Sequence, residues 1–130
     1  NGAIAYTPGA TRVDSPVEEV VRVGRGVCQD MAHLMIACAR RRGVAARYIS
    51  GWLNVPNHEG PGESHAWVEL AIPGLGWVEF DPTNGLVGGA NLIRVAVARE
   101  PHQALPLQGS YYGAAEDYID MEVEVRVTRG

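Results

Sequence analysis

The sequence contains no lysine, so all 11 of its basic residues are arginines. The only run of adjacent basic residues is Arg40, Arg41 and Arg42, and the formal net charge is −4. Proteins that bind DNA or RNA concentrate positive charge on one face, because much of their affinity comes from contacts with phosphates. A protein with this charge pattern is therefore not expected to bind nucleic acid.

Long apolar runs are also absent. No segment approaches the roughly 20 apolar residues that a helix needs to cross a bilayer, and no charged-then-apolar leader opens the chain. With 46% apolar and 20% charged residues, the composition is that of an ordinary globular protein. We expect no membrane contact within these residues. The compartment stays open, with the cytoplasm favoured, and so does the oligomeric state.

The length of 130 residues suits one domain with a single core. The chain begins at Asn1 rather than at a methionine, and residues 1–14 are turn-rich and carry no complete element. We therefore interpret residues 1–130 as one domain and as the C-terminal part of a longer protein that lacks its N-terminal region.

Cysteine is scarce too. The chain has two, Cys28 and Cys38, which is too few for a disulfide framework. If both lie on one helix, a rise of about 15 Å separates them, which exceeds the limit of about 7 Å between Cα atoms that a disulfide can bridge. The two cysteines are therefore not expected to pair.

The apolar pattern predicts an α+β fold, in which a buried helix packs on an antiparallel sheet. Residues 16–23 predict a short helix, because an early proline followed by acidic residues is typical of a helix start. In residues 28–42 apolar residues recur at three- and four-residue steps, which predicts a largely buried helix that Gly43 ends. Strands are predicted over 45–55, 64–72, 77–81, 91–98 and 121–127, with a loop at 54–63 and a hairpin turn at 73–76.

The two cysteines differ in their predicted surroundings. A free cysteine is most often a small buried apolar group, and Cys38 fits that interpretation because it lies on the apolar stripe of the predicted helix. Cys28 stands at the first turn of that helix, where unpaired N–H groups and the helix dipole favour an anion. Thiolates at such positions have lowered pKa values, although Asp30 places a negative charge nearby. A histidine close to Cys28 would offset that charge.

A metal site formed by Cys28, His33 and Cys38 conflicts with their spacing. These residues follow one another at steps of five, about 140° around a helix, so their side chains point in different directions. Zinc ligands must converge on one point. We therefore expect no metal and no other cofactor. His33 is expected to pack or hydrogen bond within its helix, and His58 and His102 lie in predicted loops without an identifiable partner.

His65 and Asp81 supply the base and the orienting acid that a cysteine nucleophile requires. They lie on the two arms of the predicted hairpin, where alternation places both on the face opposite the apolar residues. They can meet only if the numbers of paired residues sum to an even value, because a slip of one residue would turn one side chain to the other face. Two interpretations remain: ordinary half-exposed residues, or a Cys28–His65–Asp81 triad.

Three motifs carry a resemblance to a known family: "GVCQD" around Cys28, "SHAWVE" around His65 and "FDPTNG" around Asp81. Over roughly residues 6–112 the chain resembles the core of the bacterial transglutaminase-like superfamily, in the branch that includes cysteine proteases. The resemblance implies a papain-like core whose buried helix starts at the nucleophile, Cys28. It also implies that His65 is the base and Asp81 the orienting acid. Residues 97–106 depart from the family pattern, and this departure leaves the three residues untouched.

The chemistry implied by the resemblance is attack on a carboxamide or peptide carbonyl to form a thioester. We therefore expect a thiol-dependent amide-bond hydrolase with a peptide or protein substrate. Two alternatives stay open: a cross-linking protein-glutamine acyltransferase, and a non-catalytic scaffold or binding module of the same fold. The backbone N–H of Cys28 is a natural donor to the oxyanion, and the sequence assigns no second donor.

Overall fold

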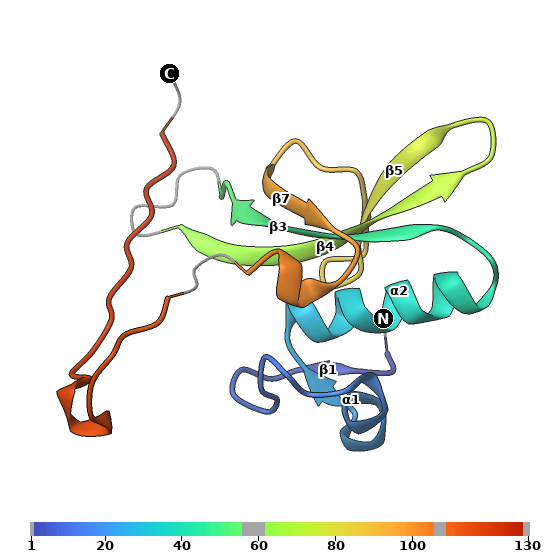
Figure 1. Cartoon of the computed structure of the whole chain (residues 1–130). Helices are drawn as coiled ribbons and strands as arrows, with labels where there is room; N and C mark the ends of the chain where they lie inside the picture. The colour runs from blue at the N-terminus through green and yellow to red at the C-terminus, as the bar shows by residue number, and fades with distance from the viewer. Residues whose placement is uncertain (1, 56–61, 106–108, 129–130) are drawn as a thin grey trace.

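The computed structural model describes residues 2–55, 62–105 and 109–128. Its largest element is a five-stranded antiparallel sheet, with one long helix, α2 (Cys28–Arg41), lying across one face (Figure 1). A shorter helix, α1 (Val17–Val23), lies on the side of α2 that faces away from the sheet. The predicted α+β class is confirmed.

Both helices end where the sequence predicts. Gly24 and Gly43 follow α1 and α2 with φ angles of 67° and 78°, in the left-handed region that side chains other than glycine rarely adopt. Within the described ranges, neither helix is long and apolar enough to span a bilayer.

Four strands of the sheet lie in predicted segments, and the fifth, β6, was not predicted because two residues carry no periodic pattern. Strands that follow one another in the chain are neighbours, except that β7 pairs with β3 at one edge. The strands are β3 (Ala46–Leu53), β4 (Glu63–Ile72), β5 (Gly76–Asp81), β6 (Leu86–Val87) and β7 (Leu92–Ala98), in the spatial order β6-β5-β4-β3-β7.

Two further short strands form a separate ribbon near α1. β1 (Ala5–Tyr6) pairs in parallel with β2 (Arg25–Gly26), which immediately precedes the start of α2. The sequence pattern predicts an irregular lead-in over residues 1–14, so β1 is a correction to that expectation. Its strand conformation depends on pairing with a segment about 20 residues away, which no local pattern reveals.

Small and branched side chains join α2 to the sheet. Ala32 and Ile36 on the helix belong to one buried cluster with Ala66, Val68 and Leu70, which alternate along β4. This is the predicted apolar face of the hairpin. Full burial of one branched aliphatic side chain contributes roughly 1.5–3 kcal/mol, so a few such residues suffice to anchor the helix.

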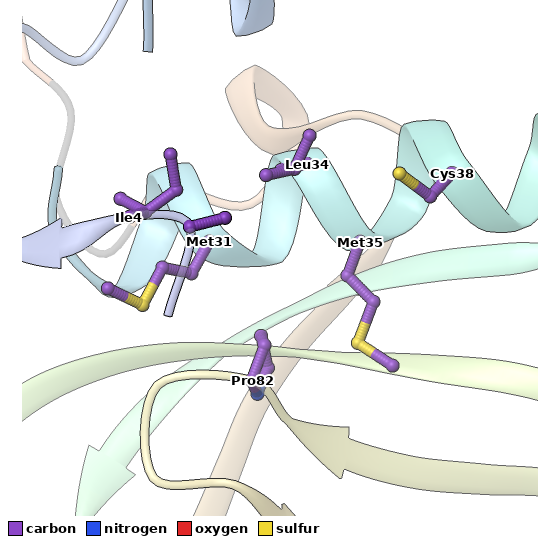
Figure 2. A pocket seen from close by; sticks show the side chains of 7 residues that line it. Ile4, Met31, Leu34, Met35, Cys38 and Pro82 are labelled. Carbon is purple, nitrogen blue, oxygen red and sulfur yellow. The ribbon is translucent and has the colours of Figure 1, made fainter. Parts of the chain in front are cut away.

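Cys38 is exposed, so the expectation that it fills the core is wrong. Apolar residues occupy more than one side of α2, and the side with Ala32 and Ile36 is the one that faces the sheet. Cys38 lies on a neighbouring side, at an apolar cavity of 280 Å³ (Figure 2). The other residues around this cavity are Ala3, Ile4, Met31, Leu34, Met35 and Pro82.

Residues 121–127 form no strand, so the last predicted strand is also wrong. Apolar and charged residues do alternate there, but a strand forms only where its backbone finds a partner. Within the described ranges, the backbone of this segment makes one hydrogen bond to a backbone group outside it, in which the Gly62 N–H donates to the Val125 carbonyl at 2.5 Å. Met121 and Val123 are therefore exposed.

The face of the sheet opposite α2 carries a network of charged groups around Glu69. The buried Glu69 carboxylate forms ion pairs with Arg47, at 2.7 Å, and with Arg94, which also pairs with Glu79. The Arg47 guanidinium lies 3.7 Å from the centroid of the Trp77 ring. The cost of burying one carboxylate is thus offset by two guanidinium groups.

Gly51 lies where three strands come close together. It pairs with His65 on β4, and the pairing of β3 with β7 shifts register between Ser50 and Gly51. A Cβ atom on Gly51 would overlap the carbonyl oxygen of Ile93 on β7 and lie 2.7 Å from the ring of Trp67. Glycine therefore allows β7 to pair here while Trp67 packs across the strand.

Replacement Gly51→Ala is expected to lower the free energy of unfolding by more than about 2 kcal/mol, because the backbone of β7 must move to admit the methyl group. Gly109→Ala is the matched control, since a Cβ atom there meets nothing within 4 Å. Its effect should stay within about 0.5 kcal/mol. Urea unfolding followed by tryptophan fluorescence measures both variants, and equal stabilities would contradict this account of the packing.

Candidate active site

Cys28 is the first residue of α2 and is partly exposed. The turn before it is held by Asp30, whose buried carboxylate accepts hydrogen bonds from the Val27 N–H at 2.8 Å and the Thr11 hydroxyl at 2.5 Å. A Cβ atom on Gly26 would lie 2.8 Å from this carboxylate, so the turn needs glycine there. Asp30 is therefore a positioning residue for Cys28, a role that its negative charge alone does not reveal.

Strands β4 and β5 bring His65 and Asp81 together. Nε2 of His65 lies 2.8 Å from Oδ2 of Asp81, and both side chains are almost completely buried. The hairpin pairs Val68 with Phe80, so the even register predicted from the sequence is confirmed. Trp67 supports the imidazole, since the two rings stack with centroids 6.0 Å apart. The bond through Nε2 leaves Nδ1 as the ring nitrogen available to another group.

The Cys28 thiol is the other group that His65 meets. Cys28 lies near enough to His65 for its hydrogen bonding and its charge to raise the pKa of the imidazole. The structure thus brings together the three residues that the sequence singles out, from the start of α2, from β4 and from the end of β5. Nucleophilic cysteine sites use this order of contacts, in which a base touches the thiol and a third group orients the base.

The ionisation of this cluster follows from its contacts. Burial alone would lower the pKa of His65, but the hydrogen bonds and charges of Asp81 and Cys28 outweigh it and raise the pKa to about 9. Burial alone would raise the pKa of Asp81, whereas His65 and Asn84 hold it below its usual value. At neutral pH the pair is therefore an imidazolium beside a carboxylate. A positively charged imidazole stabilises a neighbouring thiolate.

Asp81 is held in place by the turn that follows it. The N–H groups of Thr83 and Asn84 donate to Oδ1 at 3.0 and 3.2 Å, and the Asn84 side-chain amide donates to Oδ2 at 2.7 Å. Together with His65, these donors satisfy the buried carboxylate. Asn84 is not among the site residues predicted from the sequence. The available signal is the turn composition Asp-Pro-Thr-Asn-Gly, because aspartate side chains in turns accept hydrogen bonds from the backbone that follows.

Two cavities adjoin His65 and Asp81 and share Leu53 and Asn84 as walls. The two cavities therefore lie next to each other, and together they are called the cleft. The part next to His65 has a volume of 340 Å³ and the other part 630 Å³. Besides the shared walls and His65, the first is lined by Tyr6, Glu63, Ser64 and Thr83. Besides the shared walls and Asp81, the second is lined by Asn54, Val55, Leu86, Val87, Gly88, Gly89, Ala90, Asn91 and Leu92.

The other histidines lie elsewhere. His33 is half-buried, and burial lowers its pKa although Glu100 lies nearby. It lines a separate cavity with His102 and Glu100, and His58 lies outside the described residues. In the part of the chain that the structure describes, no three histidine, cysteine, aspartate or glutamate side chains are grouped so that they could hold a metal ion.

Comparison with known proteins finds a match over the residues that build this site. The model of the Transglutaminase-like superfamily matches residues 1–82. The uncharacterized protein ML0607 of Mycobacterium leprae is 38% identical over 125 residues, and the uncharacterized protein Rv2569c of Mycobacterium tuberculosis is 35% identical over 131. Both alignments cover 92% of this chain, but only 44% and 42% of the relatives. The chain therefore spans less than half the length of these relatives.

One solved structure is similar in fold as well as in sequence. It is described as that of a "Putative Cysteine Protease" from Cytophaga hutchinsonii, with a TM-score of 0.68 and 33% identity. The similarity covers 78% of this chain and 34% of that chain. Together with the α2 and sheet arrangement, it confirms the predicted transglutaminase-like, papain-like core.

In the variant Asp81→Asn, the pKa of His65 is expected to fall by about 1–3 units, because the imidazolium loses its anionic partner while its burial remains. Titration of the histidine ring protons by NMR measures this change. The signal of His33 in the same spectra is the internal control, since its contacts do not involve Asp81. A His65 pKa that stays near 9 in the variant would mean that Asp81 is not the group that raises it.

Proposed function

Because this chain belongs to the transglutaminase-like superfamily, we propose that it is a thiol-dependent amide-bond hydrolase that acts on a peptide or protein substrate. The family and the solved relative support a general function like that of a cysteine protease. The finer proposal makes Cys28 the nucleophile, His65 the acid–base group and Asp81 the orienting acid. The observation that carries it is the position of His65, bonded to Asp81 and within reach of the Cys28 thiol.

The first half of the proposed reaction forms a thioester. The Cys28 thiolate attacks the amide carbonyl carbon, and the electrons of the C=O bond move to oxygen and form an oxyanion. The backbone N–H of Cys28, at the start of α2, donates to this oxyanion. When the intermediate collapses, the C–N bond breaks and the protonated His65 gives its proton to the leaving nitrogen.

The second half restores the enzyme. Neutral His65 takes a proton from a water molecule while the water oxygen attacks the thioester carbonyl. The C–S bond then breaks, the acyl group leaves as a carboxylic acid that ionises in water, and Cys28 returns to the thiolate beside an imidazolium. Asp81 exchanges no proton in either half. Its charge and its fixed orientation stabilise the imidazolium each time it forms.

Transfer to an amine would use the same thioester, with a primary amine in place of water. We favour hydrolysis, because water needs no binding site of its own, whereas an amine acceptor does. The chain also contains no lysine, so it cannot provide a lysine amine for cross-linking to itself. Other proteins could still provide one, and the products of the reaction distinguish the two outcomes.

We expect the protein to release ammonia from a protected glutaminyl-glycine dipeptide, or to cleave its peptide bond. Cys28→Ala and His65→Ala should each lower kcat/KM by at least about 10³-fold, because each removes a group that takes part in bond making. Cys38→Ser is the matched control and should keep the wild-type rate, since Cys38 lies at a different cavity. A coupled ammonia assay and mass spectrometry of the products measure these changes.

Added primary amine separates the two reactions: glutamate and ammonia alone indicate hydrolysis, whereas a glutamyl-amine adduct indicates transfer. Equal turnover by wild type and Cys28→Ala would refute the nucleophile assignment.

Alkylation by iodoacetamide near pH 6 tests the alternative that the protein is a non-catalytic scaffold. Cys28 in the Cys38→Ser variant should react faster than Cys38 in the Cys28→Ala variant, although Cys38 is the more exposed. Equal, slow labelling would favour a non-catalytic module.

A further inference from the structure

The ribbon β1–β2 places Tyr6 beside the segment that leads into the nucleophile. Tyr6 pairs with Gly26, two residues before Cys28. Two backbone hydrogen bonds of 2.8 Å, from the residues on either side of Tyr6 to the carbonyls of Gly24 and Gly26, fix this pairing. Gly26 itself lies tightly against Asp30, which holds the turn before Cys28. The positions of Tyr6 and Cys28 are therefore set by one short, well-anchored segment.

Tyr6 lines the 340 Å³ part of the cleft together with His65. It is 56% exposed, and within the described ranges its hydroxyl has no hydrogen-bond partner, unlike that of Tyr111, which donates to the Ala114 carbonyl. Partial burial is the main cause that raises the pKa of Tyr6, and the nearby charges of Cys28 and Glu63 raise it further. The Tyr6 hydroxyl consequently stays protonated at neutral pH and can donate a hydrogen bond.

Other hydroxyl groups near the site are placed less suitably. Burial raises the pKa of Tyr48 most, and the nearby charge of Cys28 raises it further. The Tyr48 side chain, however, is buried in the core under α2. Ser64, on β4, and Thr83, in the turn after Asp81, line the same part of the cleft as His65, but both come from the sheet side that carries the base and its acid. An oxyanion donor must instead approach from the side of the Cys28 backbone N–H.

We infer that the Tyr6 hydroxyl is the second oxyanion donor, acting beside the backbone N–H of Cys28. This inference rests on the proposed function, since it concerns the intermediate of the same reaction. The carbonyl oxygen becomes an anion when the Cys28 sulfur bonds to the carbonyl carbon, and the Tyr6 O–H and the Cys28 N–H donate to it without giving up their protons. When the intermediate collapses, the C=O bond reforms and both donors are released.

The variant Tyr6→Phe tests this inference. We expect kcat for the glutaminyl-glycine dipeptide to fall by about 10²-fold with little change in KM, because the bond is made to the transition state rather than to the bound amide. The matching aldehyde, which forms a hemithioacetal with Cys28, should bind the variant correspondingly more weakly. Tyr118→Phe is the control, since Tyr118 is similarly exposed, at 54%, and lies outside the cleft.

Alkylation of Cys28 by iodoacetamide distinguishes action on the oxyanion from action on sulfur. This displacement forms no oxyanion, so Tyr6→Phe should be alkylated at the wild-type rate. Slower alkylation in the variant would overturn the assignment, because Tyr6 would then be acting on the thiolate. Unchanged turnover and unchanged aldehyde binding would overturn it as well.

If the proposed function is wrong, these experiments give a different set of results. If wild type binds the aldehyde but hydrolyses no amide, the hydrolase proposal fails, and the aldehyde affinity of Tyr6→Phe still decides the role of Tyr6. If wild type neither binds the aldehyde nor shows a reactive Cys28, both proposals fall. Thermal unfolding by circular dichroism verifies that the variant is folded.

Discussion

The close packing of α2 against β4 is the constraint on which the rest of the site depends. Ala32 on the helix and Ala66 on the strand are both buried, and their small side chains let the two backbones approach each other. Because α2 begins at Cys28, this contact fixes where the thiol lies relative to His65, one residue before Ala66. Cys28 and His65 are therefore brought together by alanine-sized contacts in the core, to which neither of them belongs.

Two buried aspartates stabilise the two halves of the site, and each does so through its own turn. Asp30 accepts the Val27 N–H before α2, and Asp81 accepts N–H groups of the turn after β5. Isolated buried carboxylates would be costly, and these donors offset the cost. Asp81 differs in that His65 completes its partners. Asp30 thus holds the turn before α2 and the Thr11 hydroxyl, whereas Asp81 holds its own turn and also fixes the charge of the imidazole.

The strands and helices that were predicted correctly from the sequence are those whose apolar pattern directly reflects which side chains are buried. Alternation along residues 64–72 and 77–81 decided which face of the hairpin is apolar, and hence the register that joins His65 to Asp81. The predictions were wrong where a segment with an apolar pattern does not pair or pack as that pattern indicates. Apolar and charged residues alternate along residues 121–127, but this segment pairs with no strand within the described ranges. In α2, apolar residues lie on several sides of the helix, so the sequence could not distinguish the side that contains Cys38 from the side that packs on the sheet. The contacts of Tyr6 with Gly26 and of Asn84 with Asp81 follow from no periodic pattern.

The cleft draws its walls from parts of the chain that are distant in sequence, and this limits how the site can be assembled. Tyr6 comes from β1, His65 from β4 and Asn84 from the turn after β5. β1 is held by the segment that precedes Cys28, whereas β4 and β5 are held by the sheet. The cleft therefore exists only when the ribbon and the sheet are both packed on α2. The cleft and the alignment of Cys28 with His65 consequently depend on the same folded contacts, so that both arise together.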